Sequence, residues 1–110
     1  MFEKNLALVP LFDIYGKLLS DEKQQMFEMY YGDDLSLSEI AEETGMSRQG
    51  VRDCLKKCEN RLLFFEEKLG FSEKIKAVEF AADKLKEIEV SRNDRETLEK
   101  IIAALETASE

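Results

Sequence analysis

The chain has 110 residues, the size of one domain or of one domain with a helical extension. Hydrophobic residues make up 44% of it, enough for a core, while 36% charged residues with only 5 glycines and 1 proline are typical of long charged helices. Histidine, the commonest general base and metal ligand, is missing, and the sequence has no phosphate-binding glycine loop or nucleophile elbow. We therefore expect a non-enzymatic protein that uses no cofactor and no metal.

The net charge of −8 argues against a general affinity for nucleic acid or for anionic membranes, because both require a basic surface. One short segment differs from the rest of the chain. Residues 47–61 hold five basic residues and two acidic ones, which makes the segment locally +3: Arg48, Arg52, Lys56, Lys57 and Arg61 against Asp53 and Glu59. Any contact with nucleic acid is therefore expected in this segment.

Neither a membrane span nor a secretion signal is visible. No apolar run approaches the ~20 residues that are needed to cross a bilayer. Residues 1–4 lack the basic start of a signal peptide, and no apolar stretch follows them. We expect a cytoplasmic protein without membrane insertion.

The first part of the chain predicts two helices, and an all-α fold is favoured because sustained alternation of polar and apolar residues is absent. The first helix accepts Pro10 in its first turn and carries an apolar stripe of Leu11, Phe12, Tyr15, Leu18 and Leu19. Ser20 is a good N-cap for the second helix. Gly32 is expected to end that helix in the left-handed conformation.

Two further helices follow, separated by a glycine turn. Ser36 and Glu39 have the spacing of a capping box, which starts a short third helix. Gly45 permits a tight turn with positive φ, and Ser47 can cap the next helix. That helix meets no breaker before Gly70, so it is expected to span about 22 residues, or ~33 Å.

A short capped helix, a glycine turn and a second helix with basic residues near its start form the pattern of a helix-turn-helix motif over residues 37–61. Its expected core positions are Ile40, Ala41, Gly45, Val51 and Leu55. With Val51 turned inward, the side chains expected to bind nucleic acid are Arg48, Gln49, Arg52, Lys56 and Lys57. Arg48 and Gln49 would approach base edges, and the other three would meet phosphates. Asp53 on this face is expected to pair with Lys56 or Lys57.

The long helix carries a continuous apolar seam, with the 4-3 spacing that packs against another helix: Val51, Leu55, Cys58, Leu62, Phe65 and Leu69. Two partners remain open. Helices after Ser72 and after Asn93, the expected N-caps within residues 72–110, would fold back onto it. Alternatively, a second copy would bind a dimer contact made of Leu62, Phe64, Phe65 and Leu69, and we expect this homodimer. Cys54 and Cys58 are too few for a structural zinc site, so we interpret them as reduced packing residues.

Beyond these patterns, the chain resembles the YlxM family of small bacterial helix-turn-helix proteins over about residues 5–71. The resemblance rests on the segments 11–19, 34–43, 47–53 and 67–70, which read LFDIYGKLL, DLSLSEIAEE, SRQGVRD and EKLG. Gly50 departs from it, since the family usually has alanine there. The middle of the chain also resembles region four of bacterial sigma factors. The resemblance implies a helix-turn-helix domain over residues 1–71 with a helical extension over residues 72–110. Because the family's gene commonly neighbours those of the signal recognition particle GTPases, it also implies a role in that pathway.

Three functions from different classes remain. The first is a regulatory protein that binds DNA or RNA through the basic second motif helix. The second is an accessory factor of the signal recognition particle, which contacts its RNA or its GTPase through the same face. The third is a structural dimer or protein-interaction module that has lost nucleic-acid binding.

Overall fold

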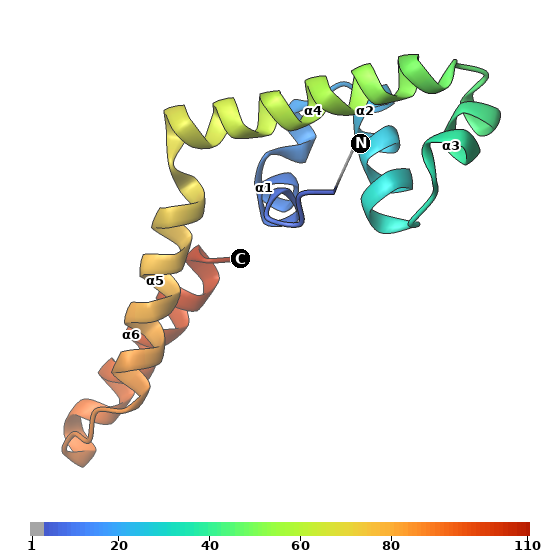
Figure 1. The fold of residues 1–110 in the computed structure, drawn as a ribbon. Helices are drawn as coiled ribbons and strands as arrows, with labels where there is room; N and C mark the ends of the chain where they lie inside the picture. Colours follow the sequence, from blue (N-terminus) through green and yellow to red (C-terminus); the bar gives the residue numbers. More distant parts are fainter. Residues whose placement is uncertain (1–3) are drawn as a thin grey trace. The chain divides into compact units, whose positions relative to one another are not determined.

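The computed structural model describes residues 4–110, and its elements are helices joined by short turns (Figure 1). The prediction of an all-α fold is confirmed: the described residues contain no strand. The helices are α1 (Leu8–Tyr15), α2 (Asp21–Phe27), α3 (Leu37–Thr44), α4 (Arg48–Leu69), α5 (Phe71–Lys86) and α6 (Arg92–Ala108). A 3₁₀ turn, η1 (Gly16–Leu18), follows α1, and a π-helical turn, η2 (Glu28–Gly32), continues α2. None of the described helices is long and apolar enough to cross a bilayer.

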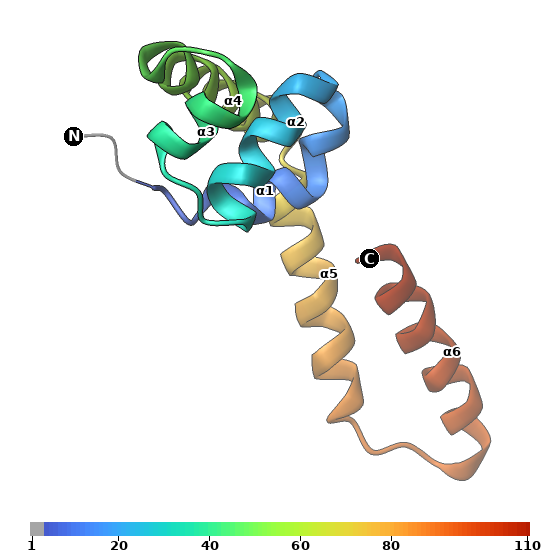
Figure 2. The ribbon, with the colours of Figure 1, turned by 90° about the vertical axis from the view of Figure 1, so that its right-hand side faces the viewer.

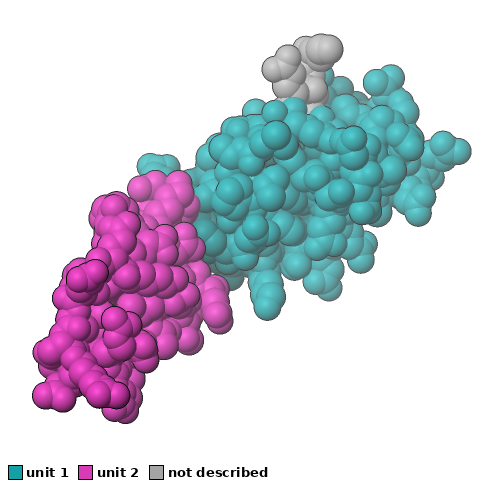
Figure 3. Space-filling view, turned by 90° about the horizontal axis from the view of Figure 1, so that it is seen from below, with its two compact units in different colours: residues 1–69 teal, residues 70–110 magenta. Residues whose placement is uncertain are grey.

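The chain divides into two compact units, residues 1–69 and residues 70–110, which Figure 3 shows in different colours. The first unit contains α1 to α4. The second is a hairpin of α5 and α6, which run side by side in Figures 1 and 2. The motif helices α3 and α4 therefore belong to one folding unit.

The first unit is built around α4, against which α1, α2 and α3 all pack. Val51, Leu55, Cys58 and Leu62 of α4 are completely buried along one side of the helix. Cys58 and Leu62 join the core formed with α1, while Val51 and Leu55 join the core formed with α3 and the end of α2. The seam predicted from the 4-3 spacing is thus used inside the unit, from residue 51 to residue 62.

Aromatic residues and two partly buried hydrogen bonds connect the α1–α2 layer to α4. The ring of Phe27 is stacked between Phe12, at 4.2 Å between centroids, and Tyr31, at 4.3 Å. The Tyr31 hydroxyl donates to Oε2 of Glu59 at 2.8 Å, and the Tyr15 hydroxyl donates to Oε1 of Glu66 at 2.7 Å. Because the two glutamates are seven residues apart, they anchor α4 at two points separated by two helical turns. Such bonds to charged acceptors contribute roughly 1.5–3 kcal/mol each.

Local capping signals in the first unit act as predicted. Ser20 Oγ accepts from the backbone N–H of Lys23 at 3.3 Å. The capping box is complete, with Glu39 N–H donating to Ser36 Oγ and Ser36 N–H donating to Glu39 Oε1, both at 3.1 Å. The predicted 22-residue length of the long helix is also confirmed.

Three predicted helix ends are wrong. Gly32 does not have a positive φ, because α2 widens into the π-helical turn and the chain reverses later, at Asp34 with φ 57°. Ser72 lies inside α5, which begins directly after the left-handed Gly70 and has no side-chain cap. Asn93 lies inside α6, whose N-cap is Ser91. In the last case the hydroxyl of Ser91 donates to the carboxylate of Asp94 at 3.0 Å.

The second unit buries little by itself. Among its described residues only Ser72 and Ala82 are buried, and no residue of α6 is. The two helices pack against each other, and their half-buried apolar side chains include Ile75, Val78, Leu85, Leu98, Ile102 and Leu105. An ion pair of 3.5 Å joins Lys86 of α5 to Glu106 of α6. The hairpin is thus held by the packing of its two helices and one bridging ion pair.

Candidate nucleic-acid interface

The turn between α3 and α4 has the geometry that the glycine predicted. Gly45 has φ 76°, and its N–H donates to the Ala41 carbonyl at 2.9 Å, which ends α3. The N–H of Met46 donates to the Thr44 hydroxyl at 3.3 Å. Ser47 then caps α4, since its Oγ accepts from the Gly50 N–H at 3.0 Å. Three residues therefore connect the two helices, and hydrogen bonds from this turn cap the end of α3 and the start of α4.

Four of the five residues expected in the motif core lie between α3 and α4. Ile40, Val51 and Leu55 are completely buried in one cluster, with Ala41 half-buried against them. Gly45 is exposed, and an added Cβ would meet nothing within 4 Å. Its role is therefore conformational and not a matter of close packing.

The side chains expected to bind nucleic acid are all exposed on the first three turns of α4: Arg48, Gln49, Arg52, Lys56 and Lys57. Gln49 donates from Nε2 to Oδ1 of Asp53 at 2.9 Å. The structure thus pairs Asp53 with a neutral amide one turn earlier, instead of with Lys56 or Lys57. The ammonium groups of both lysines lie on the surface, and the bond to Asp53 uses one of the two N–H donors of the Gln49 amide.

The buried position of Glu59 changes the charge balance of this segment. The sequence count places it among the acidic residues that oppose the basic ones, but it is only 7% exposed and its carboxylate accepts from Tyr31. Of the two carboxylates within residues 47–61, only Asp53 reaches the surface. The surface of α4 is therefore more basic than the sequence suggests. The sequence holds one signal of this burial: Glu59 and Glu66 are seven residues apart, a spacing that places both beside the apolar seam of α4.

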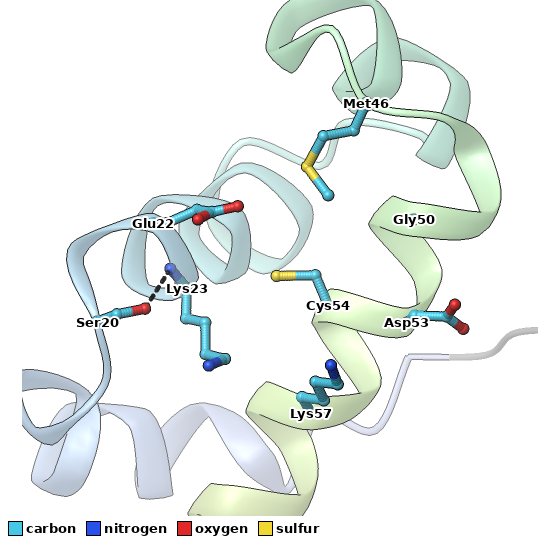
Figure 4. Close-up of a pocket in the computed structure, with 8 residues that line it drawn as sticks. All are labelled: Ser20, Glu22, Lys23, Met46, Gly50, Asp53, Cys54 and Lys57. Carbon is cyan, nitrogen blue, oxygen red and sulfur yellow. Dashed lines mark hydrogen bonds between the residues drawn. The ribbon is translucent and has the colours of Figure 1, made fainter.

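A groove of about 370 Å³ runs along α4 on the side that faces α2 (Figure 4). Lys57 lines it together with Lys23 of α2, and Glu22 and Cys54 lie between the two helices. The Cys54 side chain points toward α2, whereas the Asp53 carboxylate points away from it (Figure 4). Lys23 was not among the sequence-predicted residues. Lys23 adds one positive charge from α2 beside the basic surface of α4.

The two cysteines are placed as packing groups. Cys58 is completely buried, its thiol donates to the Lys23 carbonyl at 3.6 Å, and burial raises the pKa of this thiol to about 12. Burial, followed by the nearby Glu22 carboxylate, also raises the pKa of Cys54. Both cysteines are free thiols. Within residues 4–110, no cluster of three or more side chains is arranged to hold a metal ion.

The first motif helix, α3, has the opposite charge to α4. Its exposed carboxylates are Glu39, Glu42 and Glu43. They belong to a longer acidic stretch, residues 21–46, in which eight acidic residues stand against Lys23: Asp21, Glu22, Glu28, Asp33, Asp34, Glu39, Glu42 and Glu43. In DNA-bound helix-turn-helix proteins the first helix crosses the sugar-phosphate backbone. Here that helix carries charge of the same sign as phosphate and would repel it.

The residues expected to form a dimer contact are divided between core and surface. Leu62 is completely buried in the α1–α4 core, which removes it from any contact with a second copy. Phe65 is half-buried beside Tyr15, at 5.8 Å between ring centroids. Phe64 is 46% exposed and Leu69 is 40% exposed. The apolar surface that α4 offers is therefore narrower than the sequence indicated.

Comparison with known proteins agrees with the motif. Residues 2–102 match the model of the UPF0122 family, described as "Putative helix-turn-helix protein, YlxM / p13 like". A UPF0122 protein of Thermoanaerobacter sp. (strain X514) is 45% identical over 102 residues, which cover 92% of this chain and 86% of the relative. The UPF0122 protein YlxM of Bacillus subtilis (strain 168) is 39% identical over 104 residues, or 94% of each chain. With the turn at Gly45 and the buried helix crossing, these matches establish that the chain belongs to the UPF0122 family of YlxM-like helix-turn-helix proteins.

Proposed function

We propose that this protein is a regulatory helix-turn-helix protein of the signal recognition particle pathway, which binds nucleic acid through the exposed basic face of α4. The observation that carries the proposal is the basic face itself. Its arginines and lysines lie on the surface, while Glu59, the second carboxylate of the segment, is turned into the core. The pathway is supported by the resemblance to the YlxM family, to which the comparisons add membership.

The roles of the individual side chains follow from their chemistry. Arg48 stands at the N-terminal end of α4, where a recognition helix brings its first residues to the base edges. Arg52 and Lys56 continue along the helix and suit phosphate contacts. The acidic surface of α3 opposes unspecific binding elsewhere, so that only a ligand matched to α4 is held.

A second candidate is a protein-interaction or structural dimer without nucleic-acid binding. The acidic first motif helix favours it, because that helix is unsuited to a phosphate backbone. A homodimer would use Phe64 and Leu69 with the exposed edge of Phe65. Sedimentation equilibrium at micromolar concentration should then give about twice 12.7 kDa, and Phe64→Glu should shift the mass toward the monomer by placing a charge at the contact.

Binding of three ligands across a salt series tests the proposal: signal recognition particle RNA, its GTPase and random duplex DNA. Replacing Arg48, Arg52 and Lys56 with alanine should weaken binding of nucleic acid. For duplex DNA it should also reduce the slope of log K against log salt by about 0.9 for each phosphate that the variant no longer neutralises. The fold should persist because all three side chains are exposed.

A charge-matched control replaces three lysines of the hairpin with alanine: Lys76, Lys84 and Lys100. It removes the same total charge outside the motif and should leave affinity and slope nearly unchanged. If the α4 variant binds every nucleic acid like the unmodified protein, the proposal fails. Binding of the GTPase alone, unaffected by the α4 variant, would support the second candidate.

A further inference from the structure

A second groove, of about 400 Å³, adjoins the first at Glu22 and Met46 and lies between α2 and the C-terminal end of α3. Three of the chain's four methionines line it: Met26, Met29 and Met46. Met26 is 1% exposed, whereas Met29 and Met46 are half-buried. Its volume lies within the range of about 300–1,000 Å³ that is usual for binding pockets.

Methionine side chains suit a site that must accommodate a partner. The thioether is polarizable and the unbranched chain changes shape easily, so methionines are common on surfaces that bind apolar helices of varied sequence. Met46 occupies the turn between the motif helices, where its side chain also borders the groove beside α4 (Figure 4). A partner bound in this second groove would therefore contact the turn that connects α3 and α4.

The rim of the groove is acidic. Glu22 and Glu43 line it on opposite sides, from α2 and α3. A shallower hollow of about 250 Å³ adjoins it, lined by Leu35 and by Glu39, Glu42 and Glu43. In the described part of the chain, Glu22, Glu42 and Glu43 form no ion pair. An apolar floor beneath unpaired carboxylates is complementary to a helix with apolar side chains on one face and positive charges beside them.

We propose that this groove binds a positively charged amphipathic helix of a partner protein. Large apolar side chains of that helix enter between Met29 and Met46, and its lysines or arginines meet Glu22 and Glu43. The site goes beyond the proposed nucleic-acid binding, because it uses α2 and α3 and selects the opposite charge. A protein ligand on this face and a nucleic acid on α4 can be tested separately.

The test uses two fluorescent peptides of 18 residues that share the same leucine positions on one helical face. One carries lysine at every remaining position, and the other carries glutamate. Fluorescence anisotropy with the full chain should show binding of the lysine peptide and at least about tenfold weaker binding of the glutamate peptide. Raising the salt concentration should weaken the binding of the lysine peptide, because exposed charges are screened within about 10 Å at 0.1 M salt.

Matched variants separate the groove from the general attraction of an acidic protein for a basic peptide. Glu43→Lys should lower the affinity for the lysine peptide at least about tenfold. Glu67→Lys makes the same change in net charge at an exposed position of α4, outside the groove, and should change the affinity less than about twofold. Equal effects of the two variants would overturn the proposal. Circular dichroism checks that both variants keep the helical content of the unmodified chain.

The methionines provide a direct readout of position. With ¹³C-labelled methionine methyl groups the chain gives four signals. Substituting Met29 and Met46 in turn identifies the signal of each. The lysine peptide should shift the signals of Met29 and Met46. Peptide binding that shifts neither signal would overturn the proposal. Shifts that follow protein concentration in the absence of peptide would also overturn it, since they would make a second copy the occupant.

Discussion

Gly45→Ala tests the conformation of the motif turn, and Gly32→Ala is its matched control. The two glycines are alike in one respect, because an added Cβ would meet nothing within 4 Å at either position. They differ in the backbone: Gly45 has φ 76°, whereas Gly32 lies in a helical turn without a positive φ. Any difference between the two alanine variants therefore reports the backbone conformation and not packing.

The expected magnitudes follow from that difference. A left-handed conformation costs a residue with a Cβ roughly 1–2 kcal/mol. Alanine also reduces the entropy of the unfolded chain, which stabilises by about 0.4–1 kcal/mol where the native conformation suits it. Gly45→Ala should therefore lower the free energy of unfolding by about 1 kcal/mol, and Gly32→Ala should raise it by up to about 1 kcal/mol.

Urea unfolding followed by tyrosine fluorescence measures both changes. All three tyrosines, Tyr15, Tyr30 and Tyr31, lie in the first unit, so their signal reports that unit and not the hairpin. The midpoints of the two variants should move in opposite directions. In thermal unfolding, 1 kcal/mol corresponds to roughly 4–8 °C for a domain of this size. Equal shifts would refute the left-handed turn at Gly45.

Three other results are expected. Gly50→Ala should change the free energy of unfolding by less than about 1 kcal/mol, because the gain in helix propensity is offset where the new Cβ, 3.1 Å from Ser47 Oγ, crowds the hydroxyl that caps α4; a larger shift of the urea midpoint in either direction would contradict this. Cys58→Ser should cost roughly 1–3 kcal/mol without changing metal content, and loss of stoichiometric zinc on substitution would overturn the packing role. Because burial raises the pKa of Cys58 and of Tyr31 to about 12, folding favours their protonated forms; their contribution to stability should be constant from neutral pH to about pH 8, and the urea midpoint should fall as pH rises from there toward 12, less steeply in Tyr31→Phe.

Several features that depend on neighbouring residues were predictable from the sequence, although the N-caps expected at Ser72 and Asn93 were not among them. The capping box of Ser36 and Glu39 and the turn at Gly45 each involve groups within a few residues of one another, so the residue types alone indicate the structure. The seam of α4 was predictable for the same reason, since a 4-3 spacing places its residues on one side of any helix. What covers the seam is not encoded locally.

Two of the incorrect or missed features, the turn at Asp34 and the burial of Glu59, depend on contacts between distant residues. The chain reverses at Asp34 and not at Gly32, and the Asp34 carboxylate is held by Lys4, thirty residues earlier. This contact also lowers the pKa of Asp34. Glu59 is buried because Tyr31, twenty-eight residues away, supplies its hydrogen bond. A sequence read without its tertiary partners assigns such a glutamate to the surface.

If nucleic acid is the ligand, as proposed, the separation of charge between the two motif helices limits how it can approach. A ligand that lies across both helices would gain from Arg52 and Lys56 on α4 but would bring its phosphates against Glu42 and Glu43 on α3. A ligand aligned with α4 alone gains the attraction without the repulsion. Short or bent segments of nucleic acid satisfy this condition better than a straight duplex, because they can turn away before they reach α3. Under the proposed function, the acidic helix would thereby restrict the shape of the ligand, while the basic helix would supply its affinity.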